Sequence, residues 1–195
     1  MTPTVTGLRE RKHGRVAVEL DGELWRVLPA DAVVRAGLSI GRALDRAKAR
    51  ELGRELRRAE ALAAATRLLA TSDRSRRALA ERLARAGHTA APREGALAAL
   101  DRAGLVDDVR LAESRAELLA RRGYGDLGIR ADLRRRLITA GTAAEAVAAL
   151  EPELERAQRL VVGQVFTPAL MRRLSGRGFS RETVEELAAA FARDT

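Results

Sequence analysis

Cysteine is absent from this chain of 195 residues, which excludes disulfides, thiolate zinc sites and thiol catalysis. Histidine is nearly absent too, because His13 and His88 are the only two, and neither stands beside a recognisable catalytic partner. The sequence also lacks a glycine-rich loop ending in Gly-Lys-Ser/Thr and a helical His-Glu metal motif. We therefore expect a protein without enzymatic activity, cofactor or bound metal.

Long apolar runs are missing as well. No stretch approaches the roughly 18 residues of a membrane span. At the start of the chain, Thr2-Pro3-Thr4 does not have the basic and then apolar order of a signal peptide. The sequence thus predicts a soluble cytoplasmic protein that has no membrane partner.

Aromatic residues supply only 3% of the chain, whereas hydrophobic residues supply 46% and are mostly Ala and Leu. Ala and Leu are strong helix formers, and the β-branched and aromatic residues that strands favour are scarce beyond the N-terminal segment. The composition therefore predicts a mainly α-helical fold.

The charge balance is basic, with 36 Lys and Arg residues against 27 Asp and Glu residues, a net charge of +9. Such an excess attracts polyanions and is screened by salt, which favours a nucleic-acid or acidic protein partner. Lys12 and Lys48 are the only lysines, so an arginine-rich codon bias is an alternative explanation. We favour a basic binding face because the arginines cluster in the sequence.

A period-two pattern of apolar residues marks the segment from Val5 to Leu28. At its centre, Asp21-Gly22 suits a type I′ turn, since both central residues of that turn need a positive φ. Residues 5–8 are a candidate third strand. The hairpin is expected to pair Leu20 with Glu23, Val18 with Trp25, and Val16 with Val27.

Trp25 could be a core residue beneath this hairpin or a platform for base stacking, and we favour the core. An isolated hairpin is marginal in water, so it should rest on a helix over residues 31–36 that ends at Gly37. A longer helix is predicted from Arg42 to Ala70, where a bend could form near Gly53.

The rest of the chain repeats one pattern three times. Each copy has four large apolar anchors at the same spacing, and six residues after the third anchor comes a hydroxyl residue typical of a helix N-cap. The anchors are Leu69, Leu79, Leu83 and Leu100, then Leu119, Ile129, Leu133 and Leu150, then Leu160, Leu170, Leu174 and Phe191, and the hydroxyl residues are Thr89, Thr139 and Ser180.

A short three-helix unit cannot bury its apolar stripe alone, so neighbouring units must share it. We expect three tandem three-helix repeats in an elongated stack, preceded by a small N-terminal β-hairpin element, and a monomer. The predicted divisions are residues 1–58 for the hairpin and helix element, and 59–107, 108–151 and 152–195 for the three repeats.

Three segments carry a family resemblance: Ser72 to Leu79 with its Arg-Ser stretch, Gly104-Leu105-Val106-Asp107-Asp108, and Gly123 to Arg130. In order and spacing they resemble the RecX family. The resemblance implies a regulator that binds RecA filaments on single-stranded DNA, hinders their growth, and suppresses ATP hydrolysis and strand exchange, modulating recombination and DNA repair. Leu137 stands where the family usually has Gly, so we expect a differently shaped turn there.

Arginines gather around the predicted middle helix of each repeat, and only Asp132 opposes four of them between Ile129 and Ala140. Arg suits partner binding because its planar fork can hold phosphate or carboxylate oxygens and can stack on bases. The alternative is a solvated helix face. The candidate partner or nucleic-acid binding residues are Arg74, Arg76, Arg77, Arg82, Arg121, Arg122, Tyr124, Arg130, Arg134, Arg135, Arg136, Arg172 and Arg173.

Tyr124 could stack on a base or fill the gap between two repeats, and both interpretations stay open. The adjacent carboxylates Asp107 and Asp108 are predicted to cap a helix rather than to hold a metal. Two other functions compete with filament regulation: a stand-alone DNA binder of the helix-turn-helix kind and a structural helical adaptor. Against the first, the last helix of each predicted repeat is rich in Ala and poor in residues that read base edges.

Overall fold

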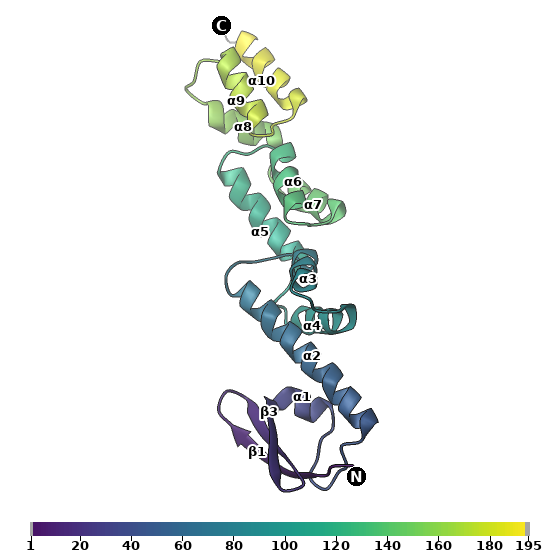
Figure 1. Cartoon of the computed structure of the whole chain (residues 1–195). Coiled ribbons are helices and arrows are strands. Elements are labelled where there is room, and N and C mark those ends of the chain that lie inside the picture. Colours follow the sequence, from purple (N-terminus) through teal and green to yellow (C-terminus); the bar gives the residue numbers. More distant parts are fainter. Residues whose placement is uncertain (1, 194–195) are drawn as a thin grey trace. The chain divides into compact units, whose positions relative to one another are not determined.

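The computed structural model describes residues 2–193, which form a small antiparallel sheet followed by helices (Figure 1). The strands are β1 (Val5–Arg11), β2 (Arg15–Leu20) and β3 (Glu23–Pro29), in the order β1-β2-β3. The helices are α1 (Ala30–Arg35), α2 (Arg46–Leu69), α3 (Arg76–Arg85), α4 (Ala90–Arg102), α5 (Asp108–Arg121), α6 (Asp126–Arg135), α7 (Ala140–Ala148), α8 (Glu153–Val161), α9 (Pro168–Gly176) and α10 (Arg181–Arg193). The prediction of a mainly α fold with an N-terminal β-element is confirmed.

The chain divides into two compact units. The first contains the residues up to Ser72 together with Leu79–Val106, and the second contains Asp73–Ala78 together with the residues from Asp107 onward. No helix within residues 2–193 is both long enough and apolar enough to cross a bilayer. The four predicted divisions of the chain, which follow the sequence repeat, stay a prediction.

The β2–β3 turn has the predicted geometry, since φ is 50° at Asp21 and 91° at Gly22. Leu20 pairs with Glu23 as expected, but the register then shifts between Val18 and Glu19, so that Val18 pairs with Arg26. The shift also pairs Val16 with Leu28, and the two expected pairs of Val18 with Trp25 and Val16 with Val27 are wrong. The irregularity adds a residue to β3, which a period-two pattern cannot anticipate.

Trp25 does not belong to the core. Its side chain is 37% exposed, and the guanidinium of Arg26 lies 5.4 Å from its ring centroid. The core beneath the sheet instead includes Val5, Val18 and Leu28, together with apolar residues of α1 and α2. The expectation that Trp25 is buried is therefore wrong, because the shifted register changes which side chains face the helices.

The predicted third strand and the supporting helix are both present, as β1 and α1, and Gly37 follows α1 with a φ of 60°. Helix α2 begins later than predicted, at Arg46, where the side chain of Asp45 accepts a hydrogen bond from the Lys48 N–H at 2.7 Å. It continues through Gly53 without a break in the helix.

The repeated apolar anchors lie in or against three separate cores. Leu79, Leu83 and Leu100 are buried among α2, α3 and α4, whereas Ile129 and Leu133 are buried among α5, α6 and α7. The third core, among α8, α9 and α10, contains Leu170 and Leu174, and Leu160 and Phe191 pack against it. Each group of three helices thus has its own core, formed at the positions that the repeat marks.

The turn after the middle helix is the same in all three groups, although Leu137 occupies the place of glycine in the second. Leu137 has a φ of 62°, beside 89° at Gly87 and 81° at Gly178. The next N–H also closes the turn in the same way, and Ile138 donates to the Leu133 carbonyl at 3.1 Å. The expectation of a differently shaped turn is wrong, and Leu137 adopts a left-handed conformation that glycine adopts without strain.

Replacing Leu137 by Gly should raise the free energy of unfolding by about 1 kcal/mol, because a side chain in the left-handed region costs about 1–2 kcal/mol. Leu137→Ala is the matched control, since it removes most of the side chain and keeps the Cβ that causes the strain. Urea denaturation followed by circular dichroism measures both. A Gly variant no more stable than the Ala variant would show that the turn carries no strain.

Candidate partner-binding surface

The start of α3 belongs to the second unit, and side chains of that same unit fix it. Ser75 is fully buried; its hydroxyl accepts from the Ala78 N–H at 3.2 Å and donates to the Arg136 carbonyl at 2.6 Å. Asp108 accepts from the N–H of Arg76, the first residue of the helix, at 2.8 Å. The first N–H groups of a helix have no partner inside it, so these bonds satisfy donors that burial would otherwise leave unpaired.

The two adjacent carboxylates therefore cap different helices. Asp107 accepts from the Arg110 N–H at 2.9 Å and is the N-cap of α5, as the sequence predicts. Asp108 caps α3, far away in the sequence. No group of three or more potential metal ligands occurs within residues 2–193.

Glu153 caps the start of α6. Its carboxylate accepts from the Asp126 N–H at 2.6 Å, and also from the Ser180 N–H at 3.1 Å and the Thr183 hydroxyl at 2.8 Å at the start of α10. Burial alone would raise the pKa of Glu153, but these hydrogen bonds together hold it below its usual value. A single ionised carboxylate thus holds two helix starts.

The backbone at the start of α6 also lies in direct contact with the turn between α9 and α10. The Gly125 N–H donates to the Arg177 carbonyl at 3.1 Å, and the Leu127 N–H donates to the Gly178 carbonyl at 3.0 Å. A Cβ on Gly178 would lie 2.1 Å from the Gly128 nitrogen, so a side chain does not fit. Glycine is required here because two backbones meet.

Arg156 is a buried cation that the sequence analysis did not identify. Its side chain is 6% exposed and donates to the Glu151 carbonyl at 2.9 Å, to the Tyr124 carbonyl at 3.0 Å and to the Asp126 carboxylate. Burial, followed by the nearby Glu153 carboxylate, raises the pKa of Asp126 despite this pairing. The sequence signal was weak: an arginine one turn before Leu160 in an otherwise amphipathic helix.

Asp132 binds three arginines. It accepts from Arg115 Nε at 2.8 Å, from Arg136 Nε at 3.1 Å and from Arg135 Nη2 at 3.4 Å. Hydrogen bonding to Arg115 is the largest cause that lowers the pKa of this carboxyl, to about 2, and Arg136 adds to it. Two of the candidate binding residues are therefore engaged inside the protein, and Arg115 was not predicted.

Other candidates on α6 remain available. Arg130 and Arg134 lie one turn apart on the same helix and are exposed, and neither has a hydrogen-bond or ion-pair partner among residues 2–193. Arg172 of α9 is exposed in the same way. Arg173 donates to Gln164 at 2.6 Å, which leaves α6 with the stronger group of free cations.

The remaining candidate binding residues lie on several different elements. Arg121 pairs with Glu117 at 3.4 Å, and Arg122 is exposed while its carbonyl accepts from Arg177. Near the start of α3, Arg74 has a buried Nε without an acceptor in the described chain, Arg76 is half-buried and Arg77 is exposed. Arg82 is exposed and belongs to the first unit.

Tyr124 is 38% exposed, and its ring lies against α6, because a Cβ on Gly128 would approach Tyr124 Cδ1 to 3.3 Å. The ring thus packs on its own helix group and keeps one part open to solvent. Both interpretations of its role, base stacking and gap filling, stay predictions.

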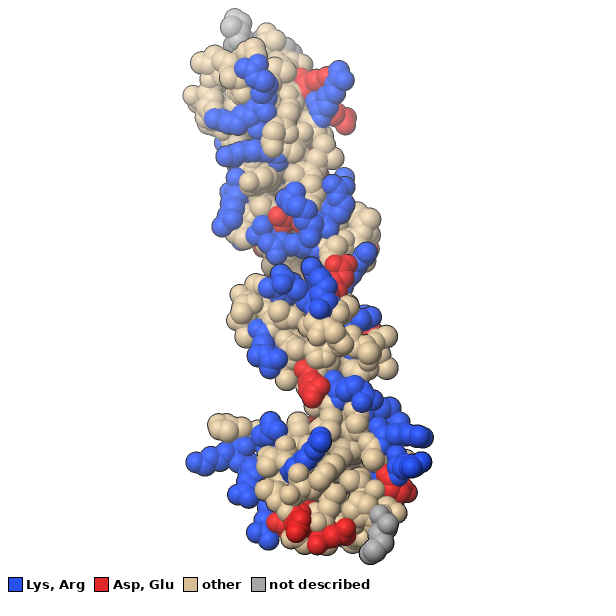
Figure 2. Space-filling view, in the orientation of Figure 1, with Lys and Arg blue, Asp and Glu red and all other residues tan. Residues whose placement is uncertain are grey.

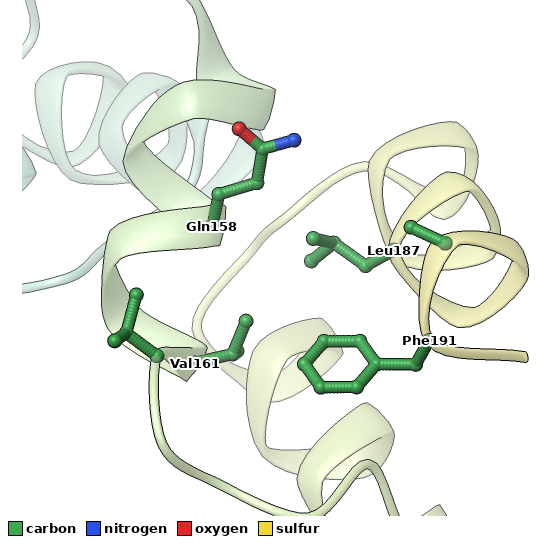
Figure 3. Close-up of a pocket in the computed structure, with 6 residues that line it drawn as sticks. Gln158, Val161, Leu187 and Phe191 are labelled. Atoms are coloured by element: carbon green, nitrogen blue, oxygen red, sulfur yellow. The ribbon is translucent and has the colours of Figure 1, made fainter. Parts of the chain in front are cut away.

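An apolar cavity of about 230 Å³ lies between α8 and α10 (Figure 3). Val161, Leu187 and Phe191 line it, and Phe191 also stacks on Phe166 with ring centroids 5.0 Å apart. Among the described residues, Gln158 is the one polar side chain of its lining. The cavity lacks the convergent polar groups that orient a small-molecule ligand.

Comparison with known proteins gives consistent matches, although no family model matches the chain. The chain is 35% identical over 145 residues to the regulatory protein RecX of Acidithiobacillus ferrooxidans, covering 68% of this chain and 91% of the relative. It is also 35% identical over 141 residues to the regulatory protein RecX of Halorhodospira halophila, covering 67% and 88%.

Two solved structures have a similar fold. A crystal structure of regulatory protein RecX superposes with a TM-score of 0.80 at 20% identity and covers 94% of this chain and 97% of that one. The crystal structure of RecX from Lactobacillus salivarius gives a TM-score of 0.60 at 17% identity, covering 70% and 97%.

Replacing Asp132 by Asn tests the ion pairs that Asp132 makes with Arg115 of α5 and with Arg135 and Arg136. The folded-state pKa of about 2 lies below the ordinary 3.8, so the ion pairs add stability above pH 4 that is lost as the pH falls toward 2. At pH 7 the variant should lose about 2 kcal/mol in free energy of unfolding. The difference from the wild-type protein should shrink between pH 4 and pH 2.

Asp73→Asn is the matched control, because Asp73 is exposed and its replacement removes the same charge. Urea denaturation across this pH range measures all three proteins. Equal stability of the two variants at pH 7 would mean that the cluster around Asp132 contributes nothing to the fold.

Proposed function

Since this chain belongs to the RecX family of regulatory proteins, we propose that it regulates the RecA recombinase by binding RecA filaments on single-stranded DNA. In this proposal, binding inhibits filament growth, ATP hydrolysis and strand exchange, and so modulates recombination and DNA repair. The protein acts in the cytoplasm by occupying the filament, as a monomer, and catalyses no reaction of its own.

Two exposed arginines of α6, Arg130 and Arg134, are the residues that we propose contact the filament. Arg130 and Arg134 project from one helix and make no hydrogen bond or ion pair with their side chains among residues 2–193, whereas Arg135 and Arg136 bind Asp132. The pairing of Asp132 with Arg115 ties α6 to α5 and so fixes the helix that carries the free pair. A helix that presents two exposed guanidinium groups outside any ion pair suits the carboxylates of an acidic protein surface or the phosphates of DNA.

A regulator of this kind works through many weak contacts. Exposed charge pairs contribute little individually, but several contacts on one polymeric partner add up through effective concentration. If the protein binds one state of the filament more tightly than another, it shifts the filament toward the favoured state. Filament growth and nucleotide turnover both depend on such states, so the proposal accounts for both effects.

The double variant Arg130→Gln, Arg134→Gln should inhibit RecA less than the wild-type protein does. Measured as RecA ATP hydrolysis on single-stranded DNA, half-inhibition should need about thirty times more protein, because the two lost charge-assisted contacts contribute on the order of 1 kcal/mol each. Gln keeps the helix propensity of Arg, so the fold should be unchanged.

The control is Arg159→Gln, Arg181→Gln, which removes the same charge from two exposed arginines paired with Glu151 and Glu185. It should inhibit like the wild-type protein. If both variants weaken equally, net charge and not the α6 pair sets the affinity. If the wild-type protein leaves ATP hydrolysis untouched, the proposed function itself is wrong.

A further inference from the structure

Four arginines form a single row along the N-terminal half of α2, in the first unit. Arg46, Arg50, Arg54 and Arg57 are all exposed and line an open hollow of about 520 Å³ on the helix surface. Their spacing of four, four and three residues keeps them on one face over roughly 16 Å, given a rise of about 1.5 Å per residue. We call this row the α2 arginine stripe; basic side chains gather over this part of α2 in Figure 2.

The stripe is only weakly compensated inside the fold: Arg54 is one of the cations that lower the pKa of Glu51, after Lys48. None of its four guanidinium groups has a hydrogen-bond or ion-pair partner in the part of the chain that the structure describes. The nearest carboxylates of α2 are already engaged, since Glu51 binds Lys48 at 2.7 Å and Glu55 binds Arg58 at 3.4 Å. The like charges repel one another along the helix, so an external anion would relieve a repulsion that the fold leaves in place.

The fold does not need these side chains. The buried face of α2 in this region contains Leu52, with Leu56 packed against the same core, and the stripe lies away from it. Between the arginines the lining consists of Ala49 and Gly53. Arg57 Nη1 lies only 3.4 Å from where a Cβ on Gly53 would be, so this guanidinium lies along the helix over the space that glycine leaves.

The chemistry of the stripe identifies its ligand. A protein interface is built around large apolar or aromatic anchors, and the lining of the hollow offers only arginine, alanine and glycine. Binding of single strands relies on aromatic side chains that stack on bases, which this lining also lacks. Neither Asn nor Gln is present to read base edges. A row of arginines without aromatic neighbours suits the phosphate backbone of a duplex, because the bases of a duplex are already stacked on one another.

We propose that the α2 arginine stripe binds the phosphate backbone of duplex DNA without reading its sequence. This interaction is distinct from the proposed binding of RecA filaments, and it needs no recombinase. Four phosphate contacts release about four condensed counterions, so the logarithm of the affinity should fall against the logarithm of the salt concentration with a slope of about −3.6. Affinity should therefore drop about 150-fold between 50 and 200 mM salt.

The test is fluorescence anisotropy of a short labelled duplex of mixed sequence, with the full chain and no RecA. The test variant changes Arg46, Arg50, Arg54 and Arg57 together to Gln, which preserves helix propensity. The control variant removes the same charge from exposed arginines elsewhere in the first unit: Arg11, Arg67, Arg85 and Arg102. Circular dichroism and thermal unfolding establish that both variants fold.

The stripe variant should bind the duplex at least 10-fold more weakly than the control at low salt. The slope of the logarithm of its affinity against the logarithm of the salt concentration should be much shallower than that of the wild-type protein. Oligo(dT) of the same length is the second probe and should bind the wild-type protein more weakly than the duplex does. Equal loss in both variants would overturn the proposal, as would a loss confined to oligo(dT). Because RecA is absent, these outcomes are independent of whether the protein regulates the recombinase.

Discussion

The arrangement of the second unit depends on carboxylates that cap helices distant in the sequence. Asp108 and Glu153 are the first residues of α5 and α8, yet each accepts the first N–H of an earlier helix, α3 or α6. A helix start that is buried without an acceptor is strongly unfavourable, so these bonds fix where α3 and α6 begin. By contrast, α9 is capped locally, by Thr167. Helix α6, which carries Arg130 and Arg134, is therefore held at its start as well as through its apolar face.

Much of the fold could be predicted because its determinants are local. The apolar anchors recur at fixed spacing, and a helix with such spacing has one face to bury, so Leu83, Leu133 and Leu174 had to lie in cores. Likewise, Asp21-Gly22 specifies its turn through the φ values of two adjacent residues. Where the physical cause lies within a few residues, the pattern in the sequence contains it.

The predictions that are wrong depend on contacts between residues that are distant in the sequence. Trp25 is exposed because one extra residue in β3 shifts the register, and Leu137 keeps the turn unchanged because it adopts a left-handed conformation that residues other than glycine rarely adopt. The charge pattern showed Asp132 among arginines, but not that Arg115, from another helix, would bind it. Which arginines are free and which are engaged is decided by tertiary contacts, so the list of candidates was broader than the group the structure leaves available.

The capping of α6 by Glu153 also has a consequence for synthesis. The ribosome makes the chain from the N-terminus, so α6 emerges well before the carboxylate that accepts its first N–H. Until α8 has left the exit tunnel, the N-terminal turn of α6 can only be hydrated or frayed. Maturation of α3 and α6 therefore lags behind translation by about one helix group, whereas the start of α9 can form as soon as its own N-cap, Thr167, has emerged.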